Sequence, residues 1–330
     1  MDRRAFLLQC LAGSLAIGQL NPLLAENLGP YTTTDIYFGY GKTGIGSKIG
    51  FNLVDPLYRL QHNTHHFNFV NEPGKKTLTA TTHVQNSNPE GRQLLQVTSS
   101  LMTVFPCLFK NLPYHPLKDF KPVSLIGYNA FALVLGPAVD ASVQTVDDYI
   151  AWVRKNPEYR EIGNTFYGSE SHLASLILAR EKKVALRSLY YGGTSLMIED
   201  MLHKELAACI MVSGNAQKEI DSGVFRVIAV CSKDRHPPWP EIPTMAESGV
   251  ANMNFKGWYG IMAPKQMAGK HYHYYKDVID AARHDSEFLQ VLASLSLDVQ
   301  EVSPDDLAIE IAGEIASYKS LFYKYHISQV

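Results

Sequence analysis

The chain has 330 residues, of which 46% are hydrophobic and 19% are charged. This is the balance of an ordinary globular protein, and the length is sufficient for two domains. The formal net charge is -2, so the chain lacks the excess of basic residues that binding to nucleic acid requires. We therefore expect a globular protein with no nucleic-acid partner.

The first 25 residues have the features of an export signal. Arg3 and Arg4 precede an apolar stretch, residues 5–17, which is too short and too polar to span a bilayer. The arginine pair is typical of a twin-arginine signal, and a general secretory signal is the alternative. Residues 23–25 form an acceptable cleavage site, so we expect cleavage near Ala25 and a mature protein in the periplasm.

Three cysteines follow this signal, at Cys107, Cys209 and Cys231. None has CxxC spacing, and the last two lie in apolar runs typical of strands. We predict buried free thiols that pack as small hydrophobic residues. A disulfide between Cys209 and Cys231 is the alternative in an oxidising compartment.

Strand-like apolar runs alternate with segments of helical periodicity along the rest of the chain. Thr145 and Asp148 have the spacing of a capping box at the start of one helix. Such alternation predicts an α/β fold with mostly parallel sheets. The predicted strands are 35–38, 67–70, 94–98, 130–135, 206–212 and 224–230, and the predicted helices are 46–62, 145–156, 173–182, 195–203, 277–295 and 304–323.

Two segments, residues 113–126 and 242–264, each join a short capped helix to an extended apolar run. In the second segment Thr244 and Glu247 have capping-box spacing, and Gly249 provides the stop. Two such segments suit a chain that leaves one lobe, builds another and returns. We place residues 26–123 and 243–330 in lobe 1 and residues 124–242 in lobe 2, with the two segments as the hinge.

Both segments resemble those of the tripartite tricarboxylate transporter substrate-binding receptors, the Bug family of periplasmic solute receptors. The resemblance runs from about residue 34 to the C-terminus and is strongest between residues 113 and 264. It implies a type II periplasmic binding protein, in which two α/β lobes close over a small organic anion such as a mono- or dicarboxylate. It also implies a monomeric receptor without cofactor or catalytic activity, which serves a two-subunit membrane permease or a sensor.

One half of the predicted ligand site is the glycine-rich loop at residues 39–44. Free backbone N–H groups between a strand and a helix suit an oxyanion. In the resembled family this loop contacts the ligand carboxylate and usually contains a Gly-Gly pair followed by an aspartate. Gly41 and Lys42 stand at the pair, and Gly46 stands at or near the aspartate, so this chain lacks the acidic residue. We expect Lys42→Ala to weaken anion binding.

The same glycines permit another interpretation. Gly39, Gly41 and Gly44 match the dinucleotide-binding fingerprint, which requires an acidic residue at the end of the second strand. Glu72 comes late for that role and is followed by Pro73. An exported enzyme that binds a nucleotide at residues 39–44 is therefore the alternative function. A degenerate receptor that acts by protein contact is a third, because the aspartate is missing.

The other half of the site is predicted at residues 167–173 and 190–195, which resemble the glycine–serine loop and the Tyr-x-Gly-Ser turn of the family. Glu170 replaces the usual glycine and places a negative charge near the rim. We assign His172 first to capping and packing, and second to the ligand. The predicted ligand-binding residues are Tyr40, Gly41, Lys42, Thr43, Gly44, Ser99, Ser100, Gly168, Ser169, Ser171, His172, Tyr191, Gly192, Thr194 and Ser213.

Two groups of histidines could suggest a metal, at positions 62, 65 and 66 and at positions 271 and 273. Adjacent histidines before a strand point to opposite faces, so we predict a solvated surface and no metal site. No serine lies in a Gly-x-Ser-x-Gly elbow, and we predict no catalytic residues.

Overall fold

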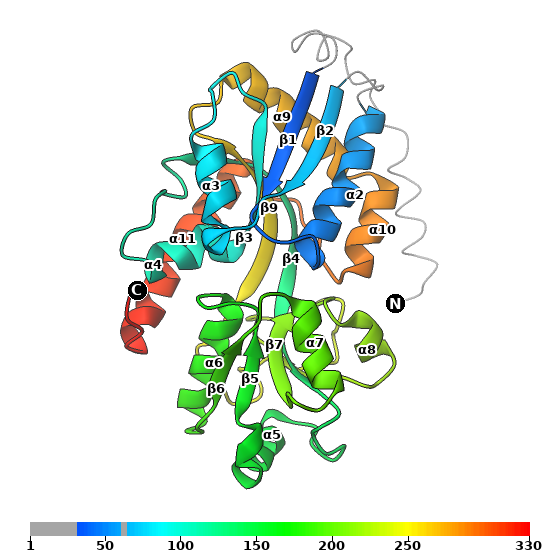
Figure 1. Cartoon of the computed structure of the whole chain (residues 1–330), viewed down its shortest axis with the longest axis vertical. Helices are drawn as coiled ribbons and strands as arrows, with labels where there is room; N and C mark the ends of the chain where they lie inside the picture. Colours follow the sequence, from blue (N-terminus) through cyan, green and yellow to red (C-terminus); the bar gives the residue numbers. More distant parts are fainter. Residues whose placement is uncertain (1–31, 61–64) are drawn as a thin grey trace.

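The computed structural model describes residues 32–60 and 65–330, which form the two α/β lobes seen one above the other in Figure 1. The predicted export signal and His62 lie outside the described residues. The sheet order is β2-β1-β3-β9-β4-β7-β5-β6, and β8 pairs with β4. The strands are β1 (Thr32–Phe38), β2 (His65–Asn71), β3 (Gln93–Thr98), β4 (Phe120–Leu135), β5 (Glu161–Asn164), β6 (Arg187–Tyr190), β7 (Ala208–Val212), β8 (Arg226–Val230) and β9 (Lys256–Pro264).

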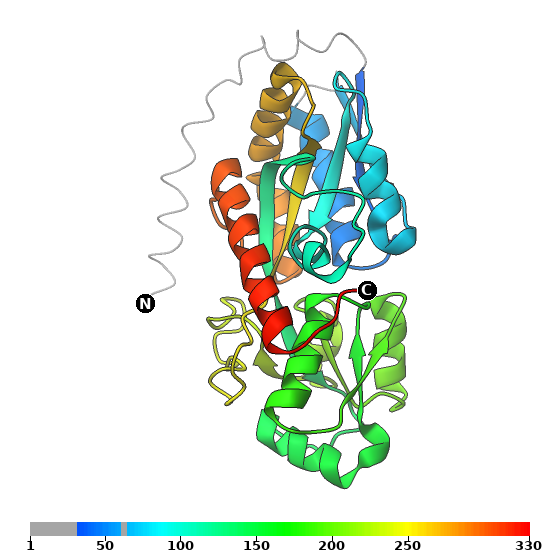
Figure 2. The same cartoon turned by 90° about the vertical axis from the view of Figure 1, so that its left-hand side faces the viewer.

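Helices cover the sheet of each lobe. In the first lobe α2 packs against α9 and α10, and α3 lies on the opposite side of the sheet (Figure 2). The helices are α2 (Ile45–Leu60), α3 (Leu78–Gln85), α4 (Phe105–Leu108), α5 (Val146–Lys155), α6 (Glu170–Glu181), α7 (Thr194–Leu202), α8 (Gln217–Asp221), α9 (Gly269–Arg283), α10 (Ser286–Ser294) and α11 (Pro304–Lys324), with short turns η2 (Lys75–Thr77), η3 (Ser100–Val104) and η4 (Pro157–Tyr159).

The strand directions confirm a two-lobe α/β fold. β1 is parallel to β2 and β3 in the first lobe, and β5 is parallel to β6 and β7 in the second. The antiparallel pairs are those that β4 and β9 make with their neighbours. Each lobe is thus a parallel βα unit closed on one side by a crossing strand.

β4 is the first crossing. This strand has 16 residues and is buried along almost its whole length, because nearly every side chain from Phe120 onward is apolar. It pairs with β9 as far as Ala130 and with β7 from Phe131, so one strand belongs to both sheets. The strand predicted at 130–135 is only its last part. The predicted lobe boundary at residue 124 falls inside β4.

A third crossing was not predicted from the sequence. Leu307 and Ile311 near the start of α11 pack in the core of the first lobe. Tyr318 and Phe322 near its end pack in the core of the second. Figure 2 shows this helix running alongside the first lobe and ending against the second. The lobes are therefore joined by two strands and one helix.

Two local predictions need correction. The helix predicted at 277–295 is broken after Arg283, because Asp285 caps a new helix with its carboxylate, which accepts from the N–H groups of Glu287 and Phe288. The capping-box bonds between Thr244 and Glu247 are present, at 3.1 and 2.7 Å, but residues 244–248 form only a turn.

The remaining local predictions concern cysteines and histidines. Cys107, Cys209 and Cys231 are free and buried, as predicted. His65 was expected at a solvated surface, but it is 4% exposed and hydrogen-bonds the Thr34 hydroxyl at 2.8 Å. The described residues contain no group of three or more His, Cys, Asp or Glu that could hold a metal ion, and none of their helices is long and apolar enough to cross a membrane.

Candidate functional site

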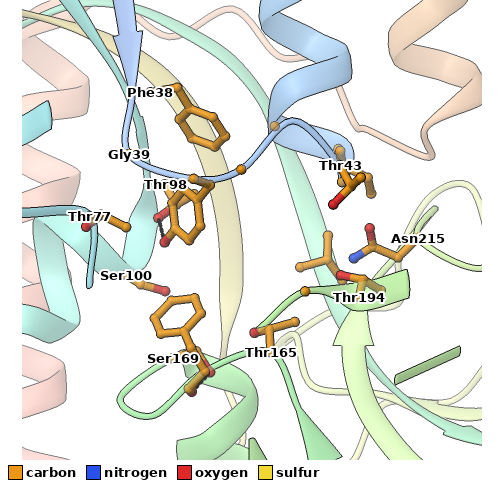
Figure 3. Close-up of a pocket in the computed structure, with 18 of the residues that line it drawn as sticks. Phe38, Gly39, Thr43, Thr77, Thr98, Ser100, Thr165, Ser169, Thr194 and Asn215 are labelled. Carbon is orange, nitrogen blue, oxygen red and sulfur yellow. Dashed lines mark hydrogen bonds between the residues drawn. The ribbon is translucent and has the colours of Figure 1, made fainter. Parts of the chain in front are cut away.

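A cavity of about 310 Å³ lies between the lobes, which is within the range of small-molecule sites. Its upper wall is the loop between β1 and α2, with Gly39 and Thr43 (Figure 3). Its lower wall is formed by the segments before α6 and α7, with Ser169 and Thr194. Residues 39–44 except Lys42 line this cavity, and from the predicted segment 168–172 only Ser169 does so.

The predicted site residues divide into two sets. Those that line the cavity are Tyr40, Gly41, Thr43, Gly44, Ser99, Ser100, Ser169, Tyr191, Gly192 and Thr194. Those outside the lining are Lys42, Gly168, Ser171, His172 and Ser213.

Three helix N-termini reach the cavity. Ile45 and Gly46 are the first residues of α2, Ser169 is the N-cap of α6, and Gly193 and Thr194 begin α7. No side chain caps α7, and neither α2 nor α7 has an acidic residue in its first turn. Helix N-termini carry partial positive charge and free N–H groups, so this arrangement favours negative charge in the cavity.

The loop of residues 39–44 is held by its neighbours. The Asn71 amide donates to the carbonyl of Tyr40 at 3.0 Å, and the Ser47 hydroxyl donates to the carbonyl of Gly41 at 2.7 Å. A Cβ on Gly46 would lie 2.3 Å from the Phe38 ring, so this packing leaves no space for a side chain there. The absence of an aspartate at this position therefore has a steric reason.

Glu170 departs from expectation most clearly. It was predicted near the rim, but its side chain is fully buried between the lobes. One carboxylate oxygen accepts a hydrogen bond from the Ser99 hydroxyl at 2.7 Å, and the other accepts one from the Ser100 hydroxyl. Ser99 and Ser100 follow β3 in the first lobe and line the cavity, so these bonds join the two lobes beside it.

His172 is engaged within its own lobe. Its Nδ1 accepts from the Gly168 N–H at 3.1 Å, so the proton of the neutral ring is on Nε2, which donates to the Tyr190 hydroxyl at 3.0 Å. Burial lowers the pKa of His172 to about 4, which keeps the ring neutral. The neighbouring Ser169 hydroxyl donates to the Phe166 carbonyl, so Ser169 and His172 do not form a nucleophile–base pair.

Ser213 and Lys42 also lie away from the ligand space. The Ser213 hydroxyl accepts from the Ala130 N–H at 3.2 Å and faces the Ser296 carbonyl, which fixes the crossing of β4. Lys42 is exposed. The charged residue that lines the cavity, among those described, is Lys76, whose Nζ lies 5.1 Å from the Phe109 ring and 5.4 Å from the Tyr167 ring.

Sequence reasoning also missed several polar residues of the lining, which are Thr77, Thr98, Asn129, Thr165 and Asn215. Thr77 Oγ1 and Asn129 Nδ2 are buried without a hydrogen-bond partner among the described residues. Unpaired buried polar atoms are costly unless a ligand or water pairs them. The Pro73-Gly74 turn was a visible signal for the first, because it reverses the chain and brings Thr77 back to the loop at Gly39. No signal in the sequence indicated Asn129, because this residue lies within a continuous strand.

The lobes are in contact around the cavity. The Tyr40 and Phe166 rings, from opposite lobes, are 5.7 Å apart between centroids. The Tyr40 hydroxyl lies 3.3 Å from Thr98 Oγ1, the bond drawn dashed in Figure 3, and fixes this ring against the first lobe. On the other flank a Cβ on Gly193 would lie 3.9 Å from Thr43 Oγ1. Residues of both lobes thus line one cavity, whose walls combine aromatic rings with polar side chains.

Two lobes that enclose one cavity and share crossing strands define the class of two-lobe solute-binding proteins. The chain matches the family model of the tripartite tricarboxylate transporter family receptor over residues 69–326. The chain belongs to this family.

Individual relatives agree with this assignment. Protein BugT of Bordetella pertussis is 28% identical over 74% of this chain and 75% of that protein. Rpa4515 of R. palustris, solved with adipate, has a TM-score of 0.81 at 20% identity and covers 91% of this chain and 99% of its own. MatC of Rhodopseudomonas palustris, solved with bound malate, has a TM-score of 0.78 at 20% identity, with 88% and 98% covered. At these identities the two solved structures establish the fold.

The nucleotide-binding alternative is not favoured. Glu72, the residue that would have to meet a ribose, pairs with His83 at 3.0 Å on the outside of the lobe. The position that ends β2 is Asn71, whose amide holds the glycine loop itself. The fold and family are those of solute receptors.

Proposed function

We propose that this protein is a periplasmic receptor that captures a small carboxylate between its lobes. The single observation that carries the proposal is the meeting of two helix N-termini without acidic residues, α2 from one lobe and α7 from the other, at one cavity. This geometry suits an anion held by main-chain N–H groups. The relatives solved with malate and with adipate support the same ligand class.

Binding proceeds by closure of the lobes about β4 and β9, with α11 following. Hydrogen bonds to a charged group contribute roughly 1.5–3 kcal/mol each. Four to six such bonds offset an association cost of about 4–15 kcal/mol, so micromolar affinity is within reach without a buried arginine. Met245 and Phe255 pack in the core of the second lobe, so the predicted return to the first lobe at residue 243 comes too early. The hinge lies where β4 and β9 separate, near Ala130 and Lys256.

The remaining parts of the proposal concern the cell. The protein is exported by a signal at residues 1–25, cleaved near Ala25, and acts as a monomer without enzymatic activity or cofactor. Its partner is a two-subunit membrane permease, and where no permease is present the receptor itself serves in sensing.

The experiment is native mass spectrometry of the purified protein, followed by a thermal-shift screen of mono- and dicarboxylates. We expect a retained small anion, and an increase in melting temperature that grows with ligand concentration, since a ligand that binds only the folded state stabilises it by mass action. A chain that retains nothing and whose melting temperature no carboxylate raises would remove the proposal.

A further inference from the structure

Glu170 places a carboxylate of the chain itself at the N-terminus of α6. It is the first residue of this helix and has no exposed surface. Both of its oxygens accept from serine hydroxyls of the opposite lobe, Ser99 at 2.7 Å and Ser100. Burial raises the pKa of Glu170, and the hydrogen bonds from Ser100 and Ser99 oppose this increase because they stabilise the ionised carboxylate, which has acceptors and no donor.

Because of these bonds, the hydroxyls of the two serines can only accept hydrogen bonds from a ligand in the cavity. A serine hydroxyl has one hydrogen and two lone pairs. The hydrogens of Ser99 and Ser100 are both directed at Glu170, yet both residues line the cavity. What they offer a ligand is therefore lone pairs, which pair with an O–H or N–H group and not with a carboxylate oxygen.

The charge of Glu170 acts on the cavity as well. Burial raises the pKa of Tyr40 and of Tyr259, and the nearby Glu170 carboxylate adds to both increases. These two tyrosines line the cavity. A ligand carboxylate on this side would face acceptor atoms and a like charge within a site of low dielectric.

The opposite side of the cavity offers hydrogen-bond donors. The first turns of α2 and α7 contain no acidic residue, and Gly46 and Thr194 of these turns line the cavity. One side of the cavity therefore suits an anion, and the side at Ser99 and Ser100 suits a donor.

We propose that Glu170 is a specificity-determining residue, which makes this receptor select a monocarboxylate that carries a hydroxyl or ammonium donor at its other end over an unsubstituted dicarboxylate of equal length. The inference rests on the proposed function, because it assumes that a carboxylate binds in this cavity. It goes further in assigning a different polarity to each side.

The test compares matched pairs of ligands by titration calorimetry. The pairs are 4-hydroxybutyrate with succinate and 6-hydroxyhexanoate with adipate, in which one terminal carboxylate is replaced by a hydroxymethyl group. For the wild-type protein we expect the hydroxy acid of the better-fitting pair to bind about tenfold more tightly, the difference between one hydrogen bond made and one lost.

Glu170→Gln is the diagnostic variant. The amide donates to one serine, which frees the hydrogen of that serine for the ligand, and the charge is removed. We expect the preference for the hydroxy acid to fall to threefold or less, chiefly through tighter binding of the diacid. The matched control is Glu158→Gln, an exposed glutamate of the same lobe, which should keep the wild-type ratio.

Every outcome is decisive. A wild-type preference for the diacid, or a ratio that Glu170→Gln leaves unchanged, overturns the inference and leaves the proposed function intact. Failure of all four acids and their amino analogues to bind the wild-type protein overturns the inference, and the proposed function then stands or falls with the thermal-shift screen. If Glu170→Gln does not fold, Ser100→Ala replaces it. That variant should weaken the hydroxy acid and leave the diacid within twofold, and equal losses for both ligands would contradict the assignment.

Discussion

The N-termini of α2 and α6 meet the same cavity from opposite lobes and are built alike, from a strand, a loop of small residues and a helix. At α6 the chain supplies its own carboxylate, Glu170, which is buried and bonded to Ser99 and Ser100. At α2 the first residue is Ile45, which carries no charge, and the second is Gly46, where the Phe38 ring leaves no space for a side chain. The comparison teaches that the same local motif can bind an external anion or be satisfied internally, and that one residue in the first turn makes the difference.

The largest expected effect comes from making the two N-termini alike. Gly46→Asp puts a carboxylate at α2, where a Cβ would already lie 2.3 Å from the Phe38 ring and 3.0 Å from the Tyr259 ring. We expect the free energy of unfolding to fall by about 3 kcal/mol, since overpacking and an unpaired buried charge act together. Binding of any carboxylate should be lost in calorimetry.

A variant at Gly41 separates the effect of an added charge from the effect of overpacking. A Cβ on Gly41 would meet no atom within 4 Å. Gly41→Asp should therefore keep the unfolding free energy within about 0.5 kcal/mol of wild type and still weaken anion binding. Wild-type affinity in both variants would mean that the α2 N-terminus does not hold the anion.

The side that contains Glu170 carries a second carboxyl, that of the half-buried Glu314 on α11. Burial, with Glu310 and Glu170 nearby, raises the pKa of Glu314 from 4.5 to about 8, and the bond from the Trp258 indole opposes this. Between these pH values the folded protein keeps a proton that the unfolded chain has released, so the free energy of unfolding falls as pH rises.

Glu314→Gln removes this pH dependence. The variant should be more stable than wild type at pH 8.5, by on the order of 3 kcal/mol, and nearly equal to it at pH 4.5. Urea denaturation at both pH values measures the difference, and taking the difference cancels other groups such as His65 and His172. A constant difference across this range would show that Glu314 titrates normally.

Variants of two lysines test which positive charge contributes to ligand binding. Lys76 lines it and lies over the Phe109 and Tyr167 rings, whereas Lys42 is exposed and outside the lining. We now expect Lys76→Ala to weaken binding of a monocarboxylate about tenfold. Lys42→Ala should change it less than about twofold at physiological salt, because exposed charges are screened. The reverse order of the two effects would restore the sequence-based expectation for Lys42.

A smaller effect than that of Lys76→Ala is expected at Thr77, whose hydroxyl is buried at the cavity without a partner among the described residues. Thr77→Val keeps the shape and removes this polar atom. Ligand affinity should fall by about fivefold, and the stability of the ligand-free protein should stay the same or rise by less than about 1 kcal/mol. A loss of stability without ligand would instead indicate that the hydroxyl has a structural role.

Much of the fold could be predicted because it depends on local pattern. Apolar runs and helical periodicity located most strands and helices, and the capping box at Thr145 is present with Asp148 N–H donating to the threonine hydroxyl at 3.1 Å. Periodicity failed between α9 and α10, because their apolar positions continue across the break that Asp285 makes. Helical periodicity also failed to show that α11 connects the lobes. The apolar face of an amphipathic helix does not indicate which of two cores it packs against.

The sequence by itself determined the two-lobe α/β architecture, the family and the two loops that face each other across the cleft, because these follow from short-range patterns of apolar, glycine and serine residues. Only the tertiary structure decided the polarity of the cleft. It buried Glu170 against two serines some 70 positions earlier in the chain, brought Lys76 and Thr77 to the cavity, and left Lys42 in solvent. The physical reason is that hydrogen-bond pairing and desolvation depend on neighbours in space, which the order of residues along the chain does not specify.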